Sequence, residues 1–410
     1  MKVFFKTFGC RTNLFDTQLM MSRLKDFTIT QNEADADIVV VNSCTVTNGA
    51  DSSVRQYLNK LQRTRKKIYL TGCGAFTQGE ELLAQKKVAG VFGHSEKSRI
   101  NELLKKENYF ELGDLEFVDD QIVTRFVGRS RAFIKVQEGC DFRCSYCIIP
   151  YVRGNARSLD EELIVEQVRR LAANGFGEFI VTGTNVGSYG KDKGGSLARL
   201  LKRLATIRGG RRLRIGSIEP IQIDEEFMEI LDEPWMARHL HIALQHTSNR
   251  MLAIMNRRNR VEEDLELFIR IAERGYAIGT DFIVAHPGES EEIFQEAYEK
   301  LQAFPLTHIH LFTYSKRDNT PSAAMKPQVP GNVAKERYKK IKELIETKNR
   351  LFRQKRVPLK VLVESRKDGR YIGYDQFYNP VHIISDLDLR GTWVEIGEYE
   401  VKERVNVAVV

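Results

Sequence analysis

The chain has 410 residues, of which 42% are hydrophobic, and a formal net charge of +8. It has no cleavable apolar segment at its N-terminus, and no later stretch approaches about 18 uninterrupted apolar residues, so we expect neither secretion nor a membrane span. A cytoplasmic location follows as the expectation, and there the six cysteines are better suited to metal binding or reaction than to disulfides. The basic excess favours a polyanionic partner without requiring one.

Residues 1–120 alternate short apolar runs with polar stretches of helical pattern. The apolar runs lie at 2–9, 36–43, 66–72 and 88–93. Strands that alternate with helices in this way predict an open parallel sheet with helices on both faces. This part of the chain is therefore expected to be an α/β domain.

Residues 131–330 continue the alternation with longer units. Six runs predicted as strands lie at 132–139, 178–185, 213–219, 239–245, 279–286 and 308–315. Six strand–helix units predict a partial (β/α)6 barrel, in which ligands gather at the carboxyl ends of the strands. Both cysteine-bearing regions of the chain thus have an α/β pattern.

The last part of the chain changes character twice. Residues 331–357 predict a basic helical connector, and the short alternating runs of 358–410 predict a small antiparallel β-barrel. Its aromatic and basic residues could stack on bases and neutralise phosphate, or the aromatic rings could instead fill the barrel core. These residues are Lys367, Arg370, Tyr371, Tyr374, Phe377 and Tyr378.

The six cysteines form two triplets. The sequence CDFRCSYC holds Cys140, Cys144 and Cys147, directly after the predicted strand 132–139. The second triplet is dispersed, and each of its members lies just beyond a predicted strand of the N-terminal sheet: Cys10, Cys44 and Cys73. Because the ends of parallel strands share one edge, we expect these three residues to converge in space.

Three thiolates per site is the informative number. Structural zinc normally takes four ligands, and near the dispersed triplet only His94 could supply a fourth. An iron–sulfur cube usually takes four cysteines, so three leave one iron open. The residues alone leave other readings open: six unrelated buried thiols, an iron–sulfur redox protein, or a zinc-dependent RNA-binding protein.

The sequence GCDFRCSYCIIPYVRG resembles the radical S-adenosylmethionine signature, CxxxCxxC with an aromatic residue, here Tyr146, before the last cysteine. The whole chain is similar to the methylthiotransferase family of these enzymes. The motifs that carry this similarity are TFGCRTNLFDT, VNSCTVTNGA, LTGCGA, TGTNVGSYG, SIEP and HPGES, in the family's order.

The resemblance implies that all six cysteines are catalytic and metal-binding, and that they hold two [4Fe-4S] clusters. The compact triplet would hold the cluster that binds S-adenosylmethionine and yields a 5'-deoxyadenosyl radical. The dispersed triplet would hold an auxiliary cluster that carries the sulfur to be inserted, and a second S-adenosylmethionine would supply the methyl group. An electron donor such as flavodoxin and a monomeric state are expected, whereas the sequence indicates no sulfur source.

The resemblance also implies cofactor contacts outside the cysteines. Gly183 and Thr184 follow the second barrel strand, and Glu219 and Gln245 end the third and fourth. Tyr146 is a further candidate. An ordinary glycine-rich turn or solvated polar side chains would explain the same residues.

Arg153 could contact substrate or cofactor, or pair with a carboxylate at the surface. FIVAHPGE departs from the family's usual GFPGE by carrying Ala285 and His286, which weakens the expectation of a cofactor contact there. His246 stands where relatives commonly have Ser, and no role is expected for it.

Members of the family modify isopentenyladenosine in tRNA, N6-threonylcarbamoyladenosine at tRNA position 37, or an aspartate of a ribosomal protein. TGTNVGSYGKD and TYSKRDNTPSAAM are most similar to the second subgroup, although Asn319 stands where Gly is expected. The resemblance therefore implies insertion of sulfur and methyl at C2 of threonylcarbamoyladenosine in the anticodon loop of tRNA. The C-terminal part resembles a TRAM domain, an RNA-binding barrel, and the basic helix is a second expected RNA contact.

Overall fold

A six-stranded parallel sheet forms the N-terminal part of the computed structural model, which describes residues 1–126 and 128–410. The strand order is β2-β1-β3-β4-β5-β6. The strands are β1 (Lys2–Thr7), β2 (Thr28–Ile29), β3 (Ile38–Ser43), β4 (Lys67–Gly72), β5 (Gly90–Phe92) and β6 (Tyr109–Glu111). The helices are α1 (Arg11–Arg23), α2 (Asn48–Leu61), α3 (Ala75–Ala84), α4 (Ile100–Leu103) and two 3-10 helices, η1 (Glu33–Asp35) and η2 (Ser95–Arg99).

Strand β3 is buried along its whole length, as the central strand of a two-sided parallel sheet should be. Val39 and Val41 enter the apolar core that contains Leu58 of α2, whereas Val40 enters a second core that contains Met20 of α1. Helices therefore cover both faces of this sheet, which confirms the predicted α/β class.

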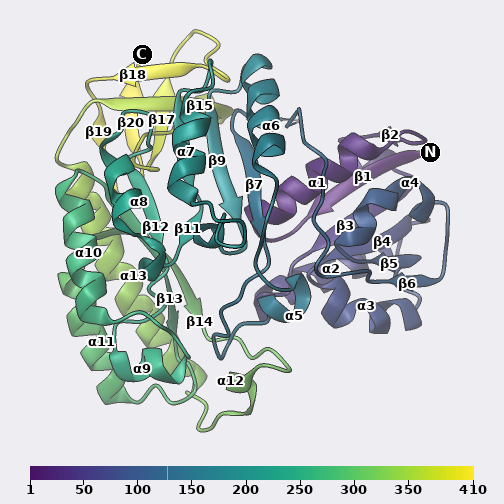
Figure 1. Cartoon of the computed structure of the whole chain (residues 1–410), viewed down its shortest axis with the longest axis horizontal. Coiled ribbons are helices and arrows are strands. Elements are labelled where there is room, and N and C mark those ends of the chain that lie inside the picture. The colour runs from purple at the N-terminus through teal and green to yellow at the C-terminus, as the bar shows by residue number, and fades with distance from the viewer. Residues whose placement is uncertain (127) are drawn as a thin grey trace.

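The central part forms a curved wall of two adjoining four-stranded sheets, ordered β10-β9-β7-β8 and β11-β12-β13-β14 (Figure 1). The strands are β7 (Ala132–Glu138), β8 (Arg157–Ser158), β9 (Glu178–Gly183), β10 (Arg212–Ile215), β11 (Ser217–Ile218), β12 (His239–Ile242), β13 (Ala277–Val284) and β14 (Leu306–Thr313). All pair in parallel except β8, which runs antiparallel to β7. The third predicted strand breaks at Gly216 into β10 and β11, and the barrel wall passes from one sheet to the other there.

Helices follow the strands of this wall, and the longer ones line its outer side (Figure 1). They are α5 (Ile149–Arg153), α6 (Glu161–Ala173), α7 (Leu197–Ala205), α8 (Glu225–Glu229), α9 (Asn249–Ile254), α10 (Val261–Glu273), α11 (Glu291–Ala303) and α12 (Pro321–Ala324), with 3-10 helices η3 (Val186–Ser188), η4 (Pro220–Gln222) and η5 (Ile230–Asp232). One apolar core runs beneath them, from Val168 of α6 to Phe268 of α10. The predicted partial barrel is therefore present.

The segment predicted as a basic connector is instead a packed helix of the barrel layer. Helix α13 (Gly331–Arg353) lies along β14, and its residues Ile341 and Ile345 are buried in the barrel core. Its basic residues Lys335, Lys339 and Lys342 are exposed. The apolar face thus belongs to the fold, and only the opposite face is free to meet a partner.

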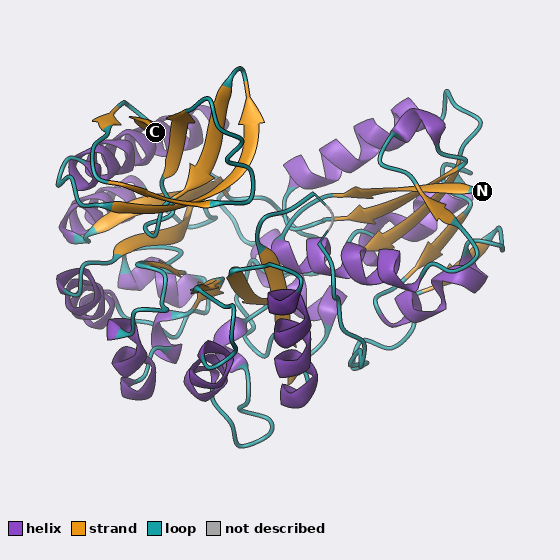
Figure 2. Cartoon of the chain, turned by 90° about the horizontal axis from the view of Figure 1, so that it is seen from above, coloured by secondary structure: helices purple, strands orange, loops and turns teal. Residues whose placement is uncertain are grey.

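The C-terminal part is a curled sheet in the order β18-β15-β16-β17-β20-β19 (Figure 2). Its strands are β15 (Leu359–Lys367), β16 (Arg370–Tyr374), β17 (Pro380–Ile384), β18 (Trp393–Ile396), β19 (Glu400–Val401) and β20 (Asn406–Val409). The pairs are antiparallel except β17 with β20, which is parallel. The predicted small β domain is thus confirmed, as a half-barrel whose edge strands are β18 and β19.

A buried ion-pair group attaches this sheet to the barrel. Glu178, at the start of β9, is fully buried and accepts hydrogen bonds from Arg212 Nε at 3.0 Å and Arg214 Nε at 2.9 Å. The two arginines also donate to backbone oxygens of the C-terminal sheet, Arg212 to Lys360 and Arg214 to Asp375. Burial alone would raise the pKa of Glu178, but Arg214 and Arg212 hold it at about 2.

The aromatic residues of the C-terminal part fill its core and its contact with the barrel. Tyr371 and Phe377 are buried in the core of the curled sheet. The ring of Tyr378 lies 5.2 Å from the ring of His239 and 4.8 Å from the guanidinium carbon of Arg214. Tyr374 stacks on Tyr378 at 5.0 Å. Of the two readings that the sequence left open, the structure supports packing: Tyr371 and Phe377 fill the core of the sheet, whereas Tyr374 and Tyr378 pack against Arg131 and Arg214 of the barrel.

Within the described residues, none of the helices combines the length and the apolar character needed to cross a lipid bilayer.

The Glu178 ion pairs make a testable contribution to stability. In Glu178→Gln the charges of Arg212 and Arg214 lose their partner, so the free energy of unfolding should fall by about 3–5 kcal/mol. Because the pKa of Glu178 is lowered on folding, this stabilisation is present above the unfolded value and is lost as pH falls toward 2. Urea unfolding followed by tryptophan fluorescence measures it, since Trp393 lies 4.6 Å from the Arg212 guanidinium.

The matched control is Glu166→Gln, which breaks an exposed pair with Arg169 and Arg170 on α6 and should leave the urea midpoint in place. Equal midpoints for the wild type and Glu178→Gln would contradict the assignment.

Candidate active site

The dispersed cysteines meet at the carboxyl edge of the N-terminal sheet. Cys10 begins α1, Cys44 follows β3 and Cys73 follows β4. Gly9, with φ +91°, makes the close approach possible: a Cβ there would lie 2.8 Å from Cys44 Sγ. The structure thus brings together three residues that are about 30 positions apart in sequence.

These three thiols differ in access. Cys44 and Cys73 are 7% and 3% exposed, whereas Cys10 is exposed. Burial raises the pKa of Cys44 to about 12 and also raises that of Cys73. Metal bonds must replace those protons, because cysteine binds metals as thiolate. The open side of this site is therefore the side of Cys10.

The compact triplet lies at the carboxyl end of β7. Cys140 follows Gly139, its amide donates to Gly154 O at 3.0 Å, and the amide of Cys147 donates to Cys144 O at 3.0 Å. Burial raises the pKa of Cys147 to about 12. Tyr146 packs in a small apolar cluster with Met251 and Met255, so its ring supports the cysteine loop from behind.

Polar atoms without partners lie beside Cys140. At the end of β9, the amide of Asn185 donates to Gln137 Oε1 at 2.8 Å, and its side-chain nitrogen lies 3.6 Å from Cys140 Sγ. Thr184 Oγ1 and Asn185 Oδ1 are buried, and neither has a hydrogen-bond partner among the described residues. Gly183 permits this packing, since a Cβ there would lie 2.9 Å from Gln137 Oε1. Buried polar atoms are normally hydrogen-bonded, so these two are suited to bind a polar ligand.

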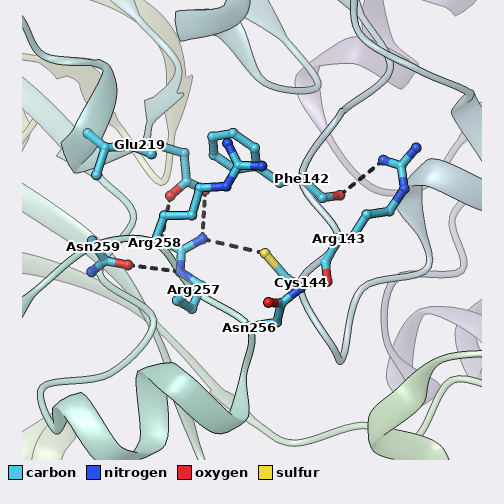
Figure 3. Close-up of a pocket in the computed structure, with 9 residues that line it drawn as sticks. Phe142, Arg143, Cys144, Glu219, Asn256, Arg257, Arg258 and Asn259 are labelled. Atoms are coloured by element: carbon cyan, nitrogen blue, oxygen red, sulfur yellow. Dashed lines mark hydrogen bonds and ion pairs between the residues drawn. The ribbon is translucent and has the colours of Figure 1, made fainter.

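Glu219 lines a cavity with Cys144, as Figure 3 shows. Arg257 joins the two: its guanidinium forms a buried ion pair with Glu219, with one contact of 2.9 Å, and Nη1 lies 3.7 Å from Cys144 Sγ. Burial alone would lower the pKa of Arg257, but Glu219 holds it well above the usual value. A permanent positive charge thus stands beside the compact triplet.

Sequence reasoning did not single out Arg257. The only signal was its place in the basic run NRRNR after α9. Gln245, by contrast, was predicted to face the same site but does not line this cavity. Its backbone has φ +66° and pairs with β13 through the amide of Ile283.

Arg153 lies six residues after Cys147 and pairs with carboxylates, as one of its two readings predicted, but in the protein interior and not at the surface. Its Nε donates to Cys73 Sγ at 3.2 Å, and its guanidinium pairs with Glu138 of β7 and with Asp16 of α1. Burial alone would raise the pKa of Asp16, but Lys135, Lys97 and Arg153 hold it well below the usual range. The residue five positions before Arg153, Ile148, contacts Cys73 as well.

A second connection runs through residues 314–325, here called the strap. Arg317 donates to Thr45 O at 3.0 Å and pairs with Asp51 of α2, next to Cys44. Farther along, the amide of Ser322 donates to Ser145 O at 2.8 Å, between Cys144 and Cys147. The strap therefore contacts both cysteine loops.

Departures from the family pattern fit the backbone here. Asn319 has φ +66° and Ala285 φ +62°, the left-handed region that suits the glycine expected at each position. Asn adopts that region readily, whereas Ala does so at a cost of about 1 kcal/mol. His286 Nε2 lies 2.8 Å from Ser322 Oγ, which places His286 against the strap.

Zinc geometry is not found in either triplet. Among the described residues, one trio of metal-ligating side chains brings its ligand atoms within 4.8 Å of one another, and it contains no cysteine. A single zinc ion with Zn–S bonds of about 2.3 Å would need its sulfur atoms roughly 3.8 Å apart. His94, the candidate fourth ligand, has Nδ1 3.0 Å from Lys97 Nζ and stacks on Phe76, while its Nε2 is buried and has no hydrogen-bond partner among the described residues. Among the described residues, neither triplet therefore has the compact spacing that a single zinc ion requires.

Family models match both parts of the chain that carry the cysteine triplets. The radical SAM superfamily matches residues 134–301, and the uncharacterized protein family UPF0004 matches residues 2–93. A Helicobacter pylori protein named "Putative methylthiotransferase" is 55% identical over 100% of this chain and 99% of its own length. The chain belongs to the radical SAM methylthiotransferase family. It is also 40% identical to the Aquifex aeolicus threonylcarbamoyladenosine tRNA methylthiotransferase MtaB, over 87% of this chain and 90% of that one.

Solved structures share the fold of this methylthiotransferase. The radical S-adenosylmethionine methyltransferase TsrM from Kitasatospora setae, with cobalamin and a [4Fe-4S] cluster bound, aligns with a TM-score of 0.60 at 16% identity. The alignment covers 78% of this chain and 77% of that chain. As a member of its family, the chain is a radical SAM enzyme that uses an iron–sulfur cluster and S-adenosylmethionine.

The residues present fit these groups. Thr184, Asn185 and the Arg257–Glu219 pair offer hydrogen-bonding and charged partners beside the compact triplet. At the other triplet, Gly9 leaves open the space that a side chain would fill beside Cys44 Sγ.

The difference in access predicts an order of thiol reactivity. In reduced, cluster-free methylthiotransferase, iodoacetamide should modify Cys10 at least about tenfold faster than Cys44 or Cys73, because burial shields both and raises their pKa. Peptide mass spectrometry over a time course measures the order, and reconstitution with iron and sulfide should protect Cys10. Equal rates for Cys10 and Cys44 would contradict the arrangement.

Proposed function

We propose that this methylthiotransferase inserts sulfur and a methyl group at C2 of N6-threonylcarbamoyladenosine at position 37 of tRNA. It would use two [4Fe-4S] clusters, one per cysteine triplet, and two molecules of S-adenosylmethionine. The observation that carries the two-cluster proposal is the presence of two cysteine triplets at the carboxyl ends of two sheets, with Arg153 bonded to Cys73 of one triplet and to Glu138, two residues before Cys140 of the other. A protein with one cluster would have no use for the second triplet at the edge of a separate sheet.

The substrate proposal is supported by the relatives. The MtaB proteins of Aquifex aeolicus and Bacillus subtilis are 40% and 33% identical to this chain, and a ribosomal protein uS12 methylthiotransferase of Heliobacterium modesticaldum is 32% identical. The exposed basic face of α13, with Lys335, Lys339 and Lys342, suits a phosphate backbone. A tRNA anticodon loop is the partner we expect.

When bound, the clusters and S-adenosylmethionine supply a radical that removes hydrogen from carbon and the sulfur that replaces it. The protein holds and orients these groups. Cys140, Cys144 and Cys147 would hold one cluster, with Arg257 placed to pair with the carboxylate of S-adenosylmethionine and Glu219 holding the guanidinium in position.

Thr184 and Asn185 would satisfy further polar groups of that cofactor. Cys10, Cys44 and Cys73 would hold the auxiliary cluster, and Arg153 balances the negative charge beside Cys73. The domain division that follows is 1–120 for the auxiliary cluster, 131–330 with α13 for the radical barrel, and 358–410 for the half-barrel.

Single cysteine variants separate the two clusters. Cys144→Ala should abolish formation of 5'-deoxyadenosine, whereas Cys44→Ala should retain it and lose sulfur insertion. Each variant should keep about four of the eight irons expected for two clusters. Anaerobic assays with chromatographic detection of 5'-deoxyadenosine and iron analysis test this, and equal loss of both activities in the two variants would contradict separate clusters.

The tRNA nucleosides decide the substrate. Cells that lack the gene should lose methylthio-threonylcarbamoyladenosine, and a wild-type copy but not Cys44→Ala should restore it. Mass spectrometry of digested tRNA makes the measurement. An unchanged tRNA profile with an unmodified ribosomal aspartate would assign the enzyme to the ribosomal protein, and loss of methylthio-isopentenyladenosine would assign it to that nucleoside.

A further inference from the structure

Four histidines and an aspartate gather on one face of strands β12, β13 and β14. This face is opposite the one that carries Leu240, Ile242 and Ile278 into the apolar core beneath the helices. The five residues are His239, His241, Asp281, His308 and His310. None of them belongs to either cysteine site.

Three of the five converge on one point. His241 Nε2 lies 3.1 Å from Asp281 Oδ1, and His310 Nδ1 lies 3.2 Å from the same oxygen. All three ligand atoms lie within 4.8 Å of one another, the trio noted above as lacking cysteine. Tetrahedral zinc with bonds of about 2.0–2.2 Å holds its ligand atoms roughly 3.4 Å apart. The two separations from Asp281 Oδ1 are close to that value, so a small adjustment of the three side chains would place them around a single ion.

The buried imidazole of His241 pairs with Asp281 and stacks on the ring of His310 at 4.5 Å. Its side chain is 7% exposed, and Nε2 makes no aligned hydrogen bond despite its short distance to Asp281. A nitrogen and an oxygen that lie close without such alignment can both point at a third atom. A buried polar atom in this state calls for a ligand.

Gly279 makes room for the imidazole rings. It lies in the middle of β13, where glycine weakens a strand. A Cβ at this position would lie 2.8 Å from His241 Nδ1 and 3.3 Å from His239 Nε2. Glycine is unfavourable in a strand, but any larger residue at this position would displace His241.

We propose that His241, Asp281 and His310 bind a divalent transition-metal ion, with Zn²⁺ as the probe. Two imidazoles and one carboxylate form a ligand set that suits zinc and its first-row neighbours, and three protein ligands leave a coordination position open. Ser217 pairs with His241, and Glu219 follows Ser217 by two residues on the same face. The proposed ion site is therefore on the strand next to the one that leads to Glu219 and its partner Arg257. The metal proposal does not depend on the identity of the tRNA substrate.

The test uses the enzyme with its clusters in place, so that the cysteines are not free to take zinc. Anaerobically reconstituted protein is treated with EDTA, desalted and dialysed against ZnCl2, and zinc and iron are measured together. We expect one zinc per chain with unchanged iron. Asp281→Asn and His310→Ala should weaken zinc binding at least about tenfold. His382→Ala, which removes a histidine of β17 outside the cluster, should leave it unchanged.

His310→Ala decides the outcome if Asp281→Asn also loses iron, because the His310 side chain is 58% exposed and its removal leaves the core intact. The proposal is overturned if iron-loaded protein retains no zinc, or if zinc binds His310→Ala and Asp281→Asn as tightly as wild type. A further outcome would also overturn the metal site: the wild-type protein takes up no zinc, and Asp281→Asn and His310→Ala bind tRNA more weakly. That result would assign the trio to binding of the nucleoside.

Discussion

The guanidinium of Arg153 is the contact on which the arrangement of the two cysteine sites depends. It lies between Cys73 of one sheet and Glu138 of the other, and it also meets Asp16 of α1. Because α5 follows Cys147 directly, the distance between the sites is set by one short helix. A planar guanidinium can serve three acceptors in fixed directions, which a lysine ammonium could not do in the same way.

The charges around Arg153 explain how so polar an interface stays buried. Asp16 accepts Lys97 at 2.7 Å and Lys135 at 2.8 Å, and Lys135 also pairs with Glu138. Each buried charge therefore has an opposite neighbour, which offsets the desolvation of the group. The strap adds an independent connection from Arg317 to the Cys44 loop and from Ser322 to the Cys144 loop. The two sheets are thus joined by polar contacts directly at the chemistry.

The sequence predicted those features that a local pattern determines. Apolar runs that end in Gly-Cys placed Cys10, Cys73 and Cys140 at strand ends, and the structure has them there. Pairings between distant residues could not be predicted, because a charged residue type does not reveal its partner: Arg257 meets Glu219 across 38 positions. The same limit applies to Tyr378, whose surroundings are set by arginines of the barrel, and to α13, which packs on a strand whose outer face the sequence did not identify.

The strap also constrains how the protein can mature. Both cysteine loops depend on contacts with residues 314–325, which lie more than 160 positions after Cys147. During synthesis, which proceeds from the N-terminus, neither loop can take its final form until most of the barrel has left the ribosome. Cofactor insertion is therefore a late event, and the nascent chain passes through a long interval with six unligated thiols. Free thiols can be oxidised, so the growing chain is open to oxidation throughout that interval.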